Sequence, residues 1–328
     1  MRRQNVVTFL GRVAAFCFIL NGLNNSSRAQ ECSSLPPPYP GAIFDANVQA
    51  WNPSIQGLID NAAKANVERV ALFANSRAGG TATVDAVLAA KRIRPDLIVA
   101  GAPKIGFIFG QDLSSEYLSS TLKDINNGTY SFIGEILYTH GDKLDHRPTP
   151  QGEVRVDPLA PGTARLLTGL RGKTVPLLTH WEAWAWERDW PRFDELYSRW
   201  PQQRFVLPSL AYGSLEQVEA VLSAHPNVWG IISRLVDGRY HFVDASKQAR
   251  VGTPMFDNCG ALVPEWRTVL IKHSDHLMYG SDYYTNQGRT WDEYPRLVAR
   301  YRRIAGQLPA DVARKVSWDN AAALYGRK

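Results

Sequence analysis

Residues 68–103, "ERVALFANSRAGGTATVDAVLAAKRIRPDLIVAGAP", contain the pattern that decides the fold. Two short apolar runs, at 68–75 and 96–103, flank a stretch with helical spacing at 82–93. Both runs are continuous rather than alternating, which is typical of parallel strands that are buried on both faces. A strand, a helix and a second strand in this order predict a βαβ unit.

The same alternation continues along the 328-residue chain. Further apolar runs of this kind lie at 41–47, 130–137, 174–181, 204–210, 227–233 and 276–282. Stretches with helical spacing lie at 53–65, 115–125, 189–200, 214–225, 265–273 and 290–308. Eight strands that alternate with helices predict an α/β fold, a single (β/α)8 TIM-like barrel over residues 41–328, and an open eight-stranded sheet is the alternative. Two long connections, at 138–160 and 235–262, are expected on the carboxyl face of the barrel.

The first 29 residues have the pattern of a secretory signal peptide. Arg2, Arg3 and Arg12 accompany the apolar run "VAAFCFILNGL", and small residues follow it up to Ala29. The run is too short to be a stable membrane span. We expect cleavage after Ala29, a Pro-rich segment at 30–40, and an exported protein that is periplasmic or secreted. A retained N-terminal anchor is the alternative.

The charge balance argues against a nucleic-acid-binding protein. The chain carries 37 Lys and Arg residues against 31 Asp and Glu residues. Four of the arginines lie in residues 1–29, so the mature chain would be nearly neutral. No run of Lys or Arg suggests a footprint on nucleic acid.

Two cysteines remain after the predicted leader, Cys32 and Cys259. In an oxidising compartment these two residues could pair, and two independent thiols are the alternative. The sequence has no CxxC motif or Cys/His cluster that would indicate a structural zinc site.

Polar residues follow the predicted strands at the points where each strand ends. In chain order they are Asn47, Gln49, Asn75, Lys104, Glu135, His180, Ser209, Arg234 and Asp282. In a barrel of this type, chemistry takes place at the carboxyl ends of the strands. Glu135 is notable because it interrupts an apolar run, and a buried carboxylate needs a partner or a cation. We therefore predict a site around Glu135, His180 and Asp282.

These residues occur in the order of a known family pattern. The pieces that carry it are "FDANVQ" (44–49), "GEI" (134–136), His180, "HPNVWGIISR" (225–234), "GSD" (280–282) and "NAAALYG" (320–326). From about residue 41 to 326 the chain resembles the amidohydrolase superfamily, and within it the amidohydrolase-2 type of metal-dependent TIM-barrel hydrolase. The resemblance implies one or two divalent metals that generate a hydroxide nucleophile. It also implies that the final Asp, here Asp282, is a metal ligand and proton acceptor.

The sequence departs from that pattern at three positions. Asn47 and Gln49 stand where the family has two metal-binding histidines, and Ser209 stands where a further histidine is expected. Amide and hydroxyl oxygens are weak, neutral donors compared with an imidazole nitrogen. We therefore expect no tightly bound zinc and no other firmly held cofactor.

A weakly bound divalent ion such as Mn²⁺ or Ca²⁺ stays open. Its ligands would be the residues that match the family pattern, namely Glu135, His180 and Asp282.

The resulting prediction is a hydrolase of a small ester, lactone or activated amide. Some members of the superfamily hydrolyse lactones without metal, which the resemblance allows here. Asp282 would be the general base, while His180 or Arg234 would stabilise negative charge beside Glu135. The predicted substrate-binding residues are Asn47, Gln49, Lys104, Trp181, Ser209 and Tyr283.

The alternative is a catalytically silent barrel that binds a small molecule. In that case the carboxylates would be structural and paired with Lys104, His180 or Arg234. In both cases the expected partner is a small molecule, with no nucleic acid and no membrane span after leader cleavage. The oligomeric state stays open, because the sequence contains no coiled coil or evident partner helix.

Overall fold

The structure is a computed structural model that describes residues 34–104, 112–140, 154–233, 242–244, 249–251, 255–285 and 289–326. The predicted signal peptide and Cys32 lie outside these residues, as does Arg234. Residues 34–328 form one compact unit. Within the described ranges, no helix is both long enough and apolar enough to cross a membrane.

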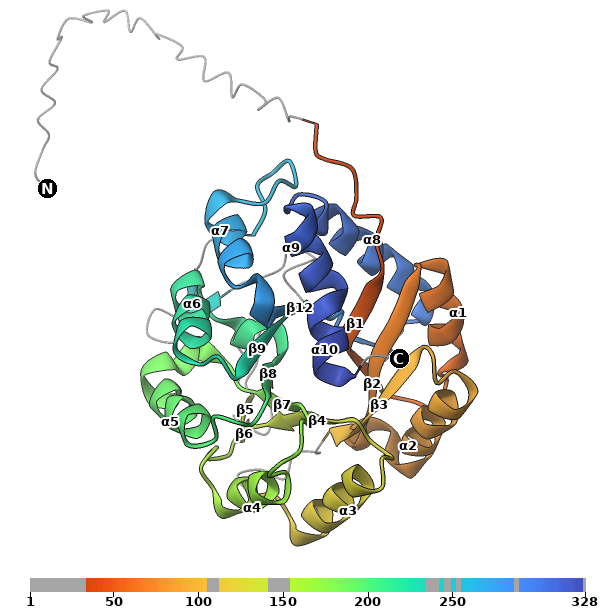
Figure 1. The fold of residues 1–328 in the computed structure, drawn as a ribbon, viewed down its shortest axis with the longest axis vertical. Helices are drawn as coiled ribbons and strands as arrows, with labels where there is room; N and C mark the ends of the chain where they lie inside the picture. Colours follow the sequence, from red (N-terminus) through yellow and green to blue (C-terminus); the bar gives the residue numbers. More distant parts are fainter. Residues whose placement is uncertain are drawn as a thin grey trace, which may run out of the picture. The chain divides into compact units, whose positions relative to one another are not determined.

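The unit is built on a parallel sheet whose strands follow the order β12-β9-β8-β7-β4-β3-β2-β1-β13 (Figure 1). The strands are β1 (Ile43–Ala50), β2 (Val67–Asn75), β3 (Ile98–Lys104), β4 (Phe132–Leu137), β7 (Leu177–His180), β8 (Phe205–Leu207), β9 (Val228–Ile232), β12 (Leu277–Tyr279) and β13 (Tyr283–Tyr284). All eight predicted apolar runs are therefore strands. The last run supplies β12 and leads directly into β13.

The sheet closes on itself through the last two strands. β12 pairs with β9, and β13 pairs with β1 through Val48 and Tyr283. Between these two pairings, the backbone N–H of Asp282 donates to the carbonyl of Asn47 at 2.8 Å. Residues 277–284 therefore act as one interrupted eighth strand that joins both edges. This closure confirms the predicted TIM-like barrel and excludes the open sheet.

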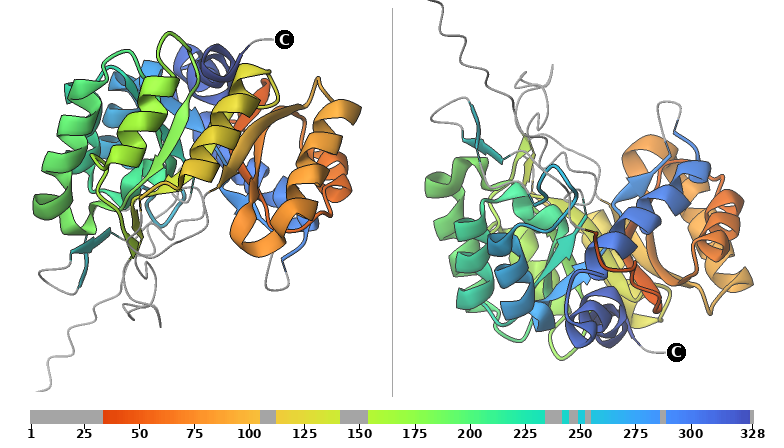
Figure 2. Two further views of the ribbon diagram at one scale, coloured as in Figure 1. Left: turned by 90° about the horizontal axis from the view of Figure 1, so that it is seen from below. Right: turned by 90° about the horizontal axis from the view of Figure 1, so that it is seen from above.

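Helices surround the strands (Figure 2). They are α1 (Gln56–Lys64), α2 (Ser76–Ile93), α3 (Ser115–Asn126), α4 (Pro161–Gly169), α5 (Trp186–Arg199), α6 (Leu215–Ala224), α7 (Pro264–Lys272), α8 (Tyr294–Ala305), α9 (Ala310–Arg314) and α10 (Asn320–Tyr325). The seven predicted helices are confirmed. The sequence pattern misses α4, because this nine-residue helix begins with Pro and Gly and ends with a second Gly.

Two small antiparallel hairpins lie in the long connections that the sequence predicts. Their strands are β5 (Thr139–His140), β6 (Val154–Arg155), β10 (Phe242–Asp244) and β11 (Ala249–Val251). The first hairpin starts two residues after β4 ends. It thereby places His140 close to the carboxyl end of the barrel.

The barrel interior is apolar and its amino end is closed by α10 (Figure 1). The buried interior side chains are Phe44, Phe73, Phe132, Leu178, Val206, Ile231 and Met278. The C-terminal Tyr325 packs into the same cluster, with its ring centroid 5.0 Å from that of Phe132. Polar chemistry is therefore left to the opposite, carboxyl end.

Asp45 stabilises the seam where the barrel closes. Its buried carboxylate accepts the backbone N–H groups of Ser281 at 2.8 Å and Asn47 at 3.2 Å, and the hydroxyl of Tyr294 at 2.8 Å. Burial raises its pKa to about 6, although these hydrogen bonds oppose the shift. A Cβ atom at Gly280 would lie 3.0 Å from the Cβ of Asn47, so glycine permits the close approach of the two strands.

We expect Asp45→Ala to lower the free energy of unfolding by about 2–5 kcal/mol, because two buried N–H groups and a buried hydroxyl lose their acceptor. Urea denaturation at pH 7 measures this change. The control is Asp96→Ala, which removes a carboxylate that is 50% exposed and paired with Arg94. That variant should lower the free energy of unfolding by less than about 1 kcal/mol. Equal losses in the two variants would show that Asp45 does not stabilise the seam.

Candidate functional site

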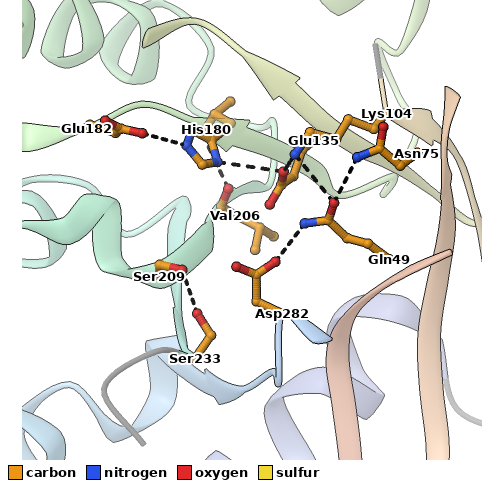
Figure 3. Close-up of polar contacts among 11 residues, drawn as sticks. Gln49, Asn75, Lys104, Glu135, His180, Glu182, Val206, Ser209, Ser233 and Asp282 are labelled. Atoms are coloured by element: carbon orange, nitrogen blue, oxygen red, sulfur yellow. Dashed lines mark hydrogen bonds and ion pairs between the residues drawn. The ribbon is translucent and has the colours of Figure 1, made fainter. Parts of the chain in front are cut away.

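A continuous polar network crosses the carboxyl end of the barrel (Figure 3), and Gln49 lies near its centre. The side-chain N–H of Gln49 donates to Asp282 Oδ1 at 2.6 Å. Its carbonyl oxygen accepts Asn75 Nδ2 at 3.3 Å and Lys104 Nζ at 3.5 Å. The reverse amide orientation would place an NH₂ group against two donors and an oxygen against a carboxylate, so only this orientation fits.

The network continues from Lys104 to β4 and β7. Lys104 forms an ion pair with the buried Glu135. Glu135 Oε2 lies 3.7 Å from His180 Nδ1, and His180 Nε2 lies 3.3 Å from Glu182 Oε1. Burial by itself would raise the pKa of Glu135, but the positive charge of Lys104 and the contact with His180 bring it well below its usual range. Glu135 is therefore an ionised structural and electrostatic centre of the site.

Strained backbone is concentrated at this end of the barrel. Asp282 has φ +49°, and four consecutive residues after β8, Ser209 to Tyr212, have φ between +50° and +55°. Non-glycine residues adopt this left-handed conformation at a cost of about 1–2 kcal/mol each. The side chain of Ser209 is held by Ser233, with 2.6 Å between the hydroxyl oxygens. Such strain is typical of functional sites, where the surrounding structure maintains it.

Asn47 is fully buried and its side-chain amide has no hydrogen-bond partner among the described residues. A register shift in the pairing of β1 with β2, between Asp45 and Val48, separates it from Gln49. Consequently the two amides differ: Gln49 is hydrogen-bonded within the network, and Asn47 is not. An orphaned buried amide marks a place where a ligand or water would supply the missing bonds.

The structure brings together five predicted site residues. Gln49, Lys104, Glu135, His180 and Asp282 belong to one network, together with Asn75. The Ser209–Ser233 pair lies close by in Figure 3. Predicted Arg234 lies outside the described residues, so its role stays a prediction.

Two predicted substrate contacts lie away from the network. Trp181 is 1% exposed, stacks on Phe193 with ring centroids 4.5 Å apart, and donates its N–H to Tyr197 of α5. Tyr283 is 5% exposed and donates its hydroxyl to the carbonyl of Thr290. Both side chains point outward to the helices, because each lies one residue beyond a residue that points inward. Neither side chain contacts the network among the described residues.

Sequence reasoning missed other residues at this end. Glu182 follows His180 at a spacing of two, which on an extended strand directs both side chains to one face. Tyr284 pairs with Gln49 across β13 and β1, and its ring stacks on Trp51 with centroids 5.1 Å apart. The guanidinium of Arg289 lies over the same tyrosine ring at 5.1 Å. A period-two pattern extended past each strand end would have found Glu182.

The residues at the metal position of the amidohydrolase pattern do not fit a zinc ion. Gln49 directs an N–H at Asp282 Oδ1, and its own oxygen faces the ammonium of Lys104. Ser209 is bonded to Ser233. His180 faces the two glutamates instead of Asp282. Of the groups that would surround a cation there, Gln49 and Ser209 are neutral and already hydrogen-bonded. His180 is directed at the glutamates.

The family resemblance is confirmed for the second half of the chain. A family model described as amidohydrolase matches residues 170–327. The match begins before β7 and excludes β1, which carries Asn47 and Gln49. A comparison with curated protein sequences finds no match for this chain.

Solved structures with the same fold cover most of the chain at low sequence identity. A protein from Agrobacterium tumefaciens is 13% identical with a TM-score of 0.54, covering 90% of this chain and 97% of its own. A candidate amidohydrolase from Staphylococcus aureus is 12% identical with a TM-score of 0.50, covering 87% and 99%. A 2,6-dihydroxybenzoate decarboxylase from Rhizobium is 10% identical with a TM-score of 0.50, covering 86% and 99%. These similarities show the fold alone, which hosts more than one chemistry.

We expect Glu135→Gln to destabilise the chain by about 3–5 kcal/mol at pH 7, because it leaves the charge of Lys104 without its buried partner. The difference between wild type and variant should depend on pH. In the folded chain the pKa of Glu135 lies well below its ordinary 4.5, so its stabilisation is fully present above about pH 4.5. It is lost as the pH falls through the lowered pKa.

Urea denaturation at a series of pH values measures this dependence. The control is Glu68→Gln, which changes an exposed carboxylate on β2. It should change the free energy of unfolding little at any pH. A difference for Glu135→Gln that grows as the pH falls would contradict the ion-pair assignment.

Proposed function

We propose that this chain, a TIM-like barrel with amidohydrolase similarity over residues 170–327, hydrolyses a small ester, lactone or activated amide without zinc at the family's usual position. The observation that carries the proposal is the Asp282–Gln49–Lys104–Glu135–His180 network at the carboxyl end of the barrel. It joins a carboxylate, an ammonium and an imidazole, which are the groups that acid–base catalysis requires.

Asp282 is the general base in this proposal. Its carboxylate is oriented by Gln49, and its strained backbone directs it from the turn between β12 and β13. It takes a proton from water as the water oxygen attacks the acyl carbon. The carbonyl oxygen gains negative charge, which Lys104 or His180 stabilises. Collapse of the intermediate breaks the acyl–oxygen bond, and the proton passes to the leaving alkoxide to give an acid and an alcohol.

The proposed substrate is uncharged. Esters and lactones are neutral. Lactones are also electrophilic enough to react at a site that activates the carbonyl group only weakly.

Trp51 and Tyr284 supply an apolar surface for such a substrate. Their rings stack beside Gln49, at the same end of the barrel as Asp282. Aromatic faces bind flat apolar rings through stacking and burial. We propose a compact substrate with an apolar ring or face next to its acyl group.

We also propose that the chain acts in an oxidising compartment outside the cytoplasm. Cys259 is disulfide-bonded, and such bonds persist in exported proteins. The signal-peptide pattern of residues 1–29 supports the same location.

A second candidate is a silent barrel that binds a small molecule. It is favoured by the pairing of the network's charged groups with one another, above all Lys104 with Glu135. A binding protein would be stabilised by its ligand and yield no product. Thermal unfolding with and without each compound of a lactone and ester panel, run beside product analysis, separates the two candidates.

We expect Asp282→Asn to reduce kcat about 10²–10⁴-fold, since it removes the general base and keeps a similar shape. The measurement is turnover of neutral lactones and aryl esters. Asp275→Asn is the matched control, because Asp275 is an exposed aspartate of the same segment that pairs with Lys315. Unchanged kcat in Asp282→Asn would reject the base assignment. Ligand stabilisation without product in the wild type would favour the binding protein.

A further inference from the structure

Three potential metal ligands meet at the His180 end of the network. They are His140 from β5, His180 from β7 and Glu182 from the turn that follows β7. One ligand atom from each lies within 4.8 Å of the other two. The imidazole rings of His140 and His180 are 5.4 Å apart at their centroids and inclined by 30°. His180 and Glu182 are nearly fully buried, while His140 is half-buried.

The spacing fits a tetrahedral ion. Zinc lies about 2.0–2.2 Å from imidazole nitrogen or carboxylate oxygen, so two such ligands on a tetrahedron are about 3.3–3.5 Å apart. His180 Nε2 and Glu182 Oε1 are 3.3 Å apart. The ligand atom of His140 lies within 4.8 Å of both, so an approach of at most about 1.5 Å completes the set. Its half-buried side chain on a two-residue strand allows this movement more readily than a core position would.

The surroundings of His180 match those of a metal-binding histidine. Such residues direct their second ring nitrogen at a carboxylate, which fixes the tautomer and makes the first nitrogen a better ligand. His180 approaches this arrangement: Nε2 lies 3.3 Å from Glu182 Oε1, and Nδ1 lies 3.7 Å from Glu135 Oε2, which is longer than a hydrogen bond (Figure 3). Lys104 in turn holds Glu135 in place.

We propose that His140, His180 and Glu182 bind a divalent transition metal ion, with Zn²⁺ the best match to two imidazoles and one carboxylate. Three protein ligands leave a fourth position open, as in catalytic zinc sites. The site shares His180 with the family's pattern and differs from it in using His140 and Glu182 in place of β1 and Asp282. It goes beyond the proposed hydrolysis, in which Asp282 acts without an ion.

Metal binding to the purified full-length protein tests this inference without any substrate. After chelation and dialysis, titration with Zn²⁺ should show one site per chain, and Co²⁺ should give the visible spectrum of a tetrahedral ion. His140→Ala and the near-isosteric Glu182→Gln should each weaken Zn²⁺ binding by more than about tenfold, and Glu135→Gln by about 10–100-fold. Thermal unfolding of each variant checks that it is folded.

His276→Asn is the control, because His276 is half-buried like His140 but lies far along the chain on the 3₁₀ turn Ser274–His276. It should bind Zn²⁺ as the wild type does. The proposal is overturned if the wild type binds no Zn²⁺, since His180 is then held by the glutamates as an ordinary hydrogen-bonding group. It is also overturned if Asp282→Asn abolishes binding while Glu182→Gln does not, since the ion would then occupy the family's position.

Discussion

The hydrogen bond from Gln49 to Asp282 joins the two ends of the barrel's closure, at positions where the family's pattern has metal ligands. Closure of the barrel brings the two residues together, and Asp45 stabilises that closure from below the site. The amide N–H competes with a metal ion for Oδ1 of Asp282. The carboxamide orients Asp282 without supplying a Lewis acid. For this reason we propose a neutral, reactive substrate.

Most of the fold could be predicted because parallel strands are buried on both faces. Their sequences are therefore continuous apolar runs, which can be recognised directly. The number of strands predicted that the sheet closes into a barrel. How it closes depends on the pairing of the last strand with both edges, which the sequence around that strand does not show. Residues 280–282 interrupt the eighth strand, and β13 resumes pairing with β1 only after the left-handed turn at Asp282. Helix α4 was not predicted because its local propensity is poor, and its formation depends on burial of Leu166 and Leu167 and on contact with α3.

The site was partly predictable by the rule that polar residues at carboxyl strand ends converge. That rule places Gln49, Lys104, Glu135, His180 and Asp282 correctly in one region. It fails one residue further along, where Trp181 turns outward to pack against α5. It also cannot anticipate the register shift in β1 that separates Asn47 from Gln49. Side-chain direction past a strand end depends on tertiary packing, which the sequence encodes only indirectly.

The most direct test of the central claim is a double-mutant cycle on the free energy of unfolding, with Gln49→Ala, Asp282→Ala and the double variant. If the amide and the carboxylate form the buried bond described here, the two losses should be non-additive by about 1–3 kcal/mol. Additive losses, within about 0.5 kcal/mol, would contradict the account. Asp282 would then owe its position to something other than Gln49.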